Sequence, residues 1–110
     1  MENTKVWYID PRSGKIDKNY YYDADTAVMK ALEVASYIDR WVRVYSVEPS
    51  SARQYYARVY PDGKILKDPQ ELYDAEKELL LTYEQDFSKH NPEKIRKIQN
   101  ILKQIGENIF

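Results

Sequence analysis

The sequence predicts an α+β fold, in which a small antiparallel sheet of hairpins packs with one helix and is followed by a C-terminal antiparallel helical hairpin. Residues 1–67 hold β-favouring runs with alternating side chains, separated by turns that contain Pro and Gly. One helical apolar period interrupts these runs, and two more fill residues 68–110. At 110 residues the chain is expected to form a single domain, 1–110, made of these two parts.

The first two elements expected are a hairpin and a helix. Residues 5–10 (KVWYID) favour a strand, PRSG at 11–14 favours a turn, and a second strand resumes at 15–16. From Asp25 to Asp39 the apolar period is that of a helix, with Asp23 or Asp25 as its N-cap. The apolar residues at this spacing are Val28, Ala31, Leu32, Ala35 and Ile38.

Two longer strands follow. Residues 40–48 (RWVRVYSVE) alternate as a strand, and residues 53–60 form a second strand, which ends at the turn PDGK and a short return strand at 64–67. In both strands one face carries small apolar side chains, which should pack on the helix. The opposite face is aromatic and basic, and its residues are Trp41, Arg43, Tyr45, Tyr56, Arg58 and Tyr60.

The C-terminal part has two helix-start signals. Residues 68–71 (DPQE) place an N-cap, a Pro and a Glu in the favoured order, and a second start follows at 91–93 (NPE). The short linker between the helices, residues 88–91, predicts that they run antiparallel. The apolar stripe of the first helix comprises Leu72, Ala75, Leu79, Leu80, Tyr83 and Phe87.

The last helix carries an apolar seam that exceeds what one partner helix covers. The seam contains Ile95, Ile98, Leu102, Ile105 and Ile109 at alternating spacings of three and four, and Ile101 adds a second edge. Either the sheet or a second copy of the chain can cover the excess, and the sequence leaves both open. In a homodimer the expected interface residues are Ile95, Ile98, Ile101, Leu102 and Ile105.

Composition excludes several classes of protein. Seventeen Lys and Arg against eighteen Asp and Glu give a net charge of −1, so no global basic field attracts duplex nucleic acid or anionic lipid. The absence of cysteine excludes disulfides, thiolate chemistry and zinc fingers. No apolar run is long enough to span a bilayer and the N-terminus lacks a secretory pattern, so the expected location is the cytoplasm.

The sequence also predicts that the protein is not an enzyme and uses no metal or cofactor. It contains no GxGxxG, Walker, HExxH or GxSxG motif. The one histidine, His90, lies in a polar linker, where an exposed residue is the expected interpretation. The carboxylates at 23–25 and 74–78 lack the spacing of a calcium loop and suit helix starts.

The aromatic and basic strand face is the main functional candidate. The helical hairpin can pack over it, another protein can dock on it, or nucleotide bases can stack on its rings. We expect a non-enzymatic protein-binding module, an adaptor or inhibitor of the kind carried by mobile elements. The alternative is a binder of single-stranded nucleic acid or nucleotides that uses the same face.

The two strand arginines also need an opposite charge. Alternation places Arg43 and Arg58 on one face of paired strands, where like charges repel. The acidic helix can neutralise them from inside the chain, or an acidic partner or phosphate can do so from outside. The internal candidates are Glu71, Asp74 and Glu78.

Overall fold

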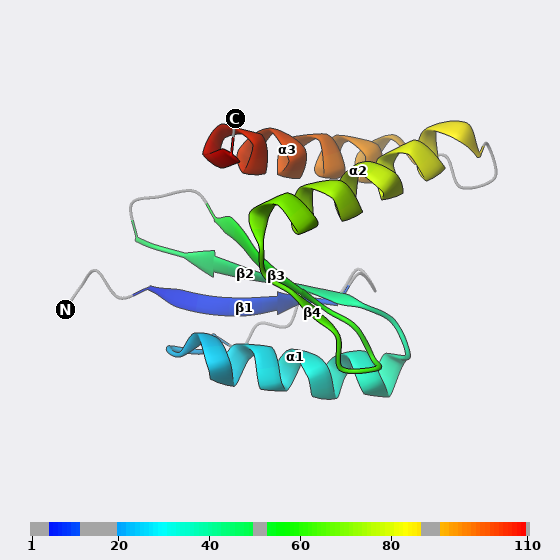
Figure 1. Ribbon diagram of the computed structural model, residues 1–110. Helices are drawn as coiled ribbons and strands as arrows, with labels where there is room; N and C mark the ends of the chain where they lie inside the picture. The colour runs from blue at the N-terminus through cyan, green and yellow to red at the C-terminus, as the bar shows by residue number, and fades with distance from the viewer. Residues whose placement is uncertain (1–4, 12–19, 50–52, 87–90, 110) are drawn as a thin grey trace. The chain divides into compact units, whose positions relative to one another are not determined.

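The computed structural model describes residues 5–11, 20–49, 53–86 and 91–109 (Figure 1). The chain divides into two compact units, residues 1–67 and residues 68–110. The first unit holds an antiparallel sheet and one helix, and the second holds a pair of helices, which confirms the predicted α+β class with a helical hairpin. The elements are β1 (Val6–Asp10), α1 (Ala24–Ile38), β2 (Val42–Val47), β3 (Gln54–Val59), β4 (Ile65–Leu66), α2 (Pro69–Gln85) and α3 (Pro92–Ile109).

The sheet has the strand order β1-β2-β3-β4 within the described residues, and all neighbours are antiparallel. The strand predicted at 15–16 lies outside the described residues. Strand β1 also forms an antiparallel bridge to Tyr21. The Trp7 N–H donates a hydrogen bond of 2.8 Å to the Tyr21 carbonyl, and the Tyr21 N–H donates one of 2.9 Å to the Trp7 carbonyl. The predicted PDGK turn is confirmed, and Gly63 adopts the positive φ of 97° that glycine tolerates there.

Helix α1 lies along one face of this sheet, as predicted. It begins at Asp23, whose carboxylate accepts a hydrogen bond of 3.0 Å from the Thr26 N–H, and it ends at Asp39 in the left-handed region. Small side chains on both sides, such as Ala31, Ala35 and Ala57, let the helix and the strands approach closely. The buried core comprises Ile9, Ala27, Val28, Ala31, Ala35, Val42, Val44, Ala57 and Val59.

A β-bulge in β3 changes the faces predicted from simple alternation. Val44 pairs with Ala57, but the next residue, Tyr45, pairs with Tyr55, so Tyr56 is an extra residue in β3. Tyr56 packs against the α1 core and meets the Trp7 ring edge-on at 6.2 Å. The assignment of Tyr56 to the face that carries the arginines is therefore wrong, and Tyr55 takes that place.

The second unit confirms both predicted helix starts. Pro69 is the first residue of α2, and the Asn91 side chain caps α3 by accepting hydrogen bonds of 3.0 and 3.2 Å from the Glu93 and Lys94 N–H groups. The two helices lie side by side and run in opposite directions (Figure 1). Within the described residues, no helix is long and apolar enough to cross a membrane.

The buried row of α3 differs in part from the predicted seam. Ile98, Ile101 and Ile105 are buried within one copy of the chain, while Ile95 and Leu102 are half-buried. Ile101, which was expected at the edge of the seam, is therefore one of its buried residues, and Leu102, which was expected within the seam, is only half-buried. An interface between two copies through these five residues stays a prediction, but three of them are already covered in a single chain.

The buried residues of α2 also include one that apolar periodicity does not reveal. Leu72 and Tyr83 are buried as predicted, and the carboxylate-bearing Glu76 between them is fully buried. Ala75, Leu79 and Leu80 are half-buried. Phe87, the last member of the predicted stripe, lies outside the described residues.

Candidate functional site

The sheet face opposite α1 gathers the arginines and most of the predicted aromatic residues. Alternation along β1 turns Tyr8 and Asp10 to this side, and the strand register sets Tyr8 opposite Tyr45 and Asp10 opposite Arg43. Arg43 in turn pairs with Arg58, as alternation predicted. We call this set the arginine face: Tyr8, Asp10, Trp41, Arg43, Tyr45, Tyr55, Arg58 and Tyr60.

Trp41 is the ring on which both paired guanidinium groups lie. The Arg58 Cζ atom is 3.8 Å from the centroid of the Trp41 ring, and the Arg43 Cζ atom is 4.9 Å from it. Arg58 also donates hydrogen bonds of 3.3 Å from Nε to the Tyr55 hydroxyl and from an Nη atom to the Tyr60 hydroxyl. Aromatic rings and hydroxyls therefore replace much of the water that would solvate these two cations.

A second cluster lies beside the first, around Arg53. The Arg53 Cζ atom is 4.8 Å from the Tyr45 ring centroid, and an Nη atom donates a hydrogen bond of 2.9 Å to the Tyr8 hydroxyl. The Tyr8 and Tyr45 rings stack at 5.4 Å. Burial on its own lowers the pKa of Arg53. The hydrogen bond to Tyr8 and the electrostatic influence of Tyr8, Tyr45 and Asp10 raise the pKa by more than burial lowers it, so the pKa lies above its ordinary value.

Most side chains of the arginine face are buried or half-buried. Arg43 is 4% exposed and Arg58 is 5% exposed, while Trp41 and Tyr60 are half-buried. Of the six residues predicted to bind a partner, five lie together here, and Tyr56 lies on the α1 side of the sheet. Because the two guanidinium groups contact rings of the same chain, a partner cannot reach them in this conformation.

The sheet itself provides an acid beside the paired arginines. Asp10 is buried directly opposite Arg43, whereas the predicted candidates Glu71, Asp74 and Glu78 are exposed on α2. Sequence reasoning missed Asp10, and with it Tyr8, because nothing in the local sequence says which strand pairs with β1. The alternation of VWYID does place Tyr8 and Asp10 on one face, and that is the signal that was available.

A second candidate surface is the exposed side of α1. We call the residues Thr26, Met29, Lys30, Glu33, Ser36 and Tyr37 the outer face of α1; together with Leu32 they line a shallow groove. Met29 is 69% exposed and Tyr37 is 91% exposed, so two large side chains with apolar surface lie together beside this groove. Lys30 and Glu33 form an ion pair with an N–O distance of 3.2 Å on this face.

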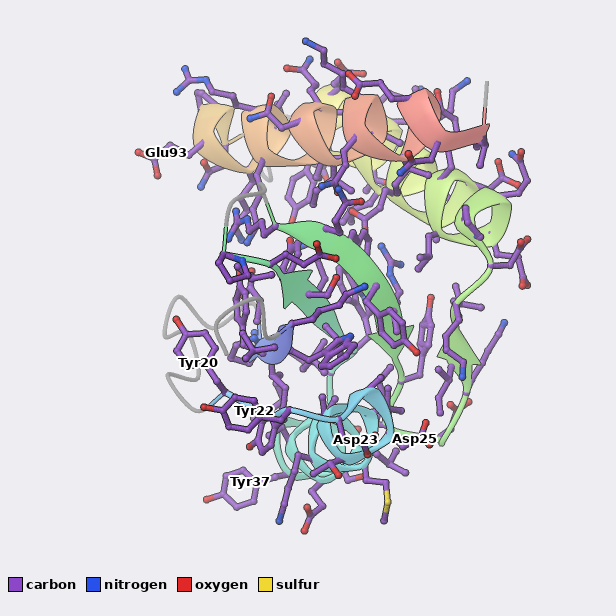
Figure 2. The ribbon with its side chains drawn as sticks, turned by 90° about the vertical axis from the view of Figure 1, so that its left-hand side faces the viewer. Tyr20, Tyr22, Asp23, Asp25, Tyr37 and Glu93 are labelled. Atoms are coloured by element: carbon purple, nitrogen blue, oxygen red, sulfur yellow. The ribbon has the colours of Figure 1, made fainter. Side chains whose placement is uncertain are left out.

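Two more tyrosines before α1, Tyr20 and Tyr22, are exposed, and the Tyr20 ring meets the Tyr8 ring of the arginine face edge-on at 5.9 Å. Figure 2 shows the side chains of Tyr20, Tyr22 and Tyr37 pointing outward from the unit. Sequence reasoning missed the outer face of α1 because it followed the buried period of the helix; the available signal was Met29 and Tyr37 at positions outside that period.

Other kinds of site find little support among the described residues. No group of three or more His, Cys, Asp or Glu residues that could hold a metal ion lies within them. His90 lies outside the described residues. Comparison with known protein families, curated proteins and solved structures gives no match for this chain.

Proposed function

We propose that the chain is a non-enzymatic protein-binding module, an adaptor or inhibitor, which binds through the outer face of α1. The observation that carries this proposal is the exposure of Met29 and Tyr37 beside a groove on a well-formed helix. Methionine and tyrosine are enriched in protein interfaces, and a rigid helix presents them at little cost in conformational entropy. Partner binding would remove these apolar side chains from water.

The arginine face is a poorer binding surface than its composition suggests. A hot spot must be reachable by the partner, and Arg43 and Arg58 are buried against Trp41 and its neighbours. Base stacking needs open ring faces, and the Trp41 ring is already occupied by guanidinium groups. We therefore assign the arginine face to the stability of the sheet, and binding to α1. The cysteine-free sequence is compatible with work in the cytoplasm.

The test uses exposed variants that leave the core intact. The tagged chain would be used to capture proteins from its native host, and each captured protein would then be purified and titrated against the chain by calorimetry. We expect a partner whose affinity falls about tenfold or more with Tyr37→Ala and with Met29→Lys, because each removes apolar contact from the interface.

A matched control separates a specific face from general stickiness. Leu81 is also a large exposed apolar residue, but it lies on α2. Leu81→Lys should leave the affinity unchanged. Equal losses with Leu81→Lys, or a partner that binds Tyr37→Ala and Met29→Lys as tightly as the wild type, would show that α1 does not carry the function.

A further inference from the structure

The charges along the outer face of α1 are arranged symmetrically about its middle, with opposite sign. The midpoint between Thr26 and Tyr37, the two ends of this face, lies between residues 31 and 32. Lys30 lies as far before this point as Glu33 lies after it. Both side chains are exposed, and within one copy they form the ion pair described above.

This symmetry fits one particular partner. We infer that the outer face of α1 docks a second copy of the same chain, with the two α1 helices antiparallel about a two-fold axis near residues 31 and 32. The inference rests on the proposed function and names its partner. In this arrangement Lys30 of one copy faces Glu33 of the other. The two-fold axis makes this pair occur twice.

The apolar groups fit the same arrangement. Reversal sets Tyr37 of one copy at the height of Thr26 in the other, so the most exposed ring covers the other end of the groove. The two-fold axis places the two Met29 side chains on opposite sides of itself, and their flexible thioethers can fill the space between the helices. A helix of 15 residues is about 22 Å long, so all these pairs fall within one helix–helix contact.

Charge also selects the direction of the partner helix. In a parallel pair in register, Lys30 would face Lys30 and Glu33 would face Glu33, and like charges repel. The antiparallel pair replaces both repulsions by attractions. It also sets the start of each helix dipole beside the end of the other, which is the favourable orientation.

The contact area predicts a weak dimer. A single pair of short helices buries less than the ~1,200 Å² typical of stable complexes. We therefore expect a dissociation constant in the range of about 1 to 100 μM, which sedimentation equilibrium can measure on the full chain. The wild type should change from monomer to dimer across this range of concentration.

Charge reversal tests the register directly. Lys30→Glu and Glu33→Lys each create two like-charged contacts in the dimer, and each should raise the dissociation constant about tenfold or more. The double variant Lys30→Glu/Glu33→Lys exchanges the signs and should restore the affinity to within about threefold of the wild type. Glu84→Lys, an exposed reversal on α2, should change nothing, and circular dichroism would check that every variant is folded.

Each outcome counts for or against the inference. A wild type that stays monomeric throughout, single reversals that dimerise as well as the wild type, or a double variant that fails to recover would overturn it. The proposed function can survive that result: a monomeric chain whose binding to a different protein is lost with Tyr37→Ala and Met29→Lys would disprove only the second-copy partner. If the chain stays monomeric and also binds no other protein through Tyr37 and Met29, the proposed function is disproved as well.

Discussion

At the scale of single residues, Trp41 explains how two arginines can face each other on neighbouring strands. Its ring lies within 4.9 Å of both guanidinium carbons, and buried Asp10 lies opposite Arg43 in the sheet. The negative face of an aromatic ring attracts a cation most strongly when both are shielded from water. The rings and the acid together offset the repulsion that the sequence raised as a problem.

This arrangement predicts that Arg58→Ala destabilises the fold. The variant removes a buried guanidinium that stacks on Trp41 and donates to two tyrosine hydroxyls, so we expect a loss of about 2–4 kcal/mol in the free energy of unfolding. Urea denaturation followed by tryptophan fluorescence would measure it. Tyr37→Ala is the control, because a side chain exposed to 91% should change stability by less than about 0.5 kcal/mol. An Arg58→Ala protein as stable as this control would contradict the assignment of the arginine face to the stability of the sheet.

The sequence predicts that this face is aromatic and basic, but it does not place every residue on the correct face. Alternation correctly brings Arg43, Tyr45 and Arg58 together, because a regular strand has a period of two. It fails at Tyr55 and Tyr56, where the bulge adds one residue to β3. Two adjacent tyrosines suit either face, so the sequence alone does not indicate where the extra residue lies.

At the scale of elements, the helices were the most predictable part of the fold. Their starts depend on local signals, such as Asp23 before α1, Pro69 in α2 and Asn91 before α3, and all three are observed. The pairing of β1 with β2 depends on residues far apart in the sequence, so local patterns cannot reveal it. The same limit hid Asp10 from the candidate site.

The seam of α3 gives the prediction for this scale. Ile98 is 2% exposed, so Ile98→Lys places a charge in an apolar site and should cost about 3–5 kcal/mol of stability. Gln99→Lys adds the same charge one residue further along, at an exposed position, and should be tolerated. Thermal unfolding followed by circular dichroism, with light scattering for molecular mass, would measure both variants. A stable, folded Ile98→Lys monomer from a dimeric wild type would instead assign the seam to a contact between copies.

At the scale of the whole molecule, the distribution of charge decides which large partners the chain can attract. The net charge is −1, Arg43 and Arg58 are buried, and α2 exposes Glu71, Asp74, Glu78 and Glu84. Affinity for nucleic acid comes mainly from exposed cations that displace counterions from phosphates. Helix α3 exposes Lys94, Arg96 and Lys103, but Glu93 and Glu107 lie on the same helix, and the net charge of −1 gives no global basic field that would draw nucleic acid to it.

We therefore expect the chain to bind no single-stranded oligonucleotide with useful affinity. Fluorescence anisotropy with labelled DNA and RNA of mixed sequence, at about 50 and 200 mM salt, should show no saturable binding below about 100 μM protein. Both salt concentrations are needed because electrostatic binding weakens steeply as salt rises, whereas an artefact of aggregation does not follow that dependence. Micromolar binding that is lost at the higher salt, and that Trp41→Ala abolishes in a protein that is still folded, would show that the arginine face is a binding site. That result would also require the buried guanidinium groups of Arg43 and Arg58 to become accessible, since phosphate contacts need them at the surface.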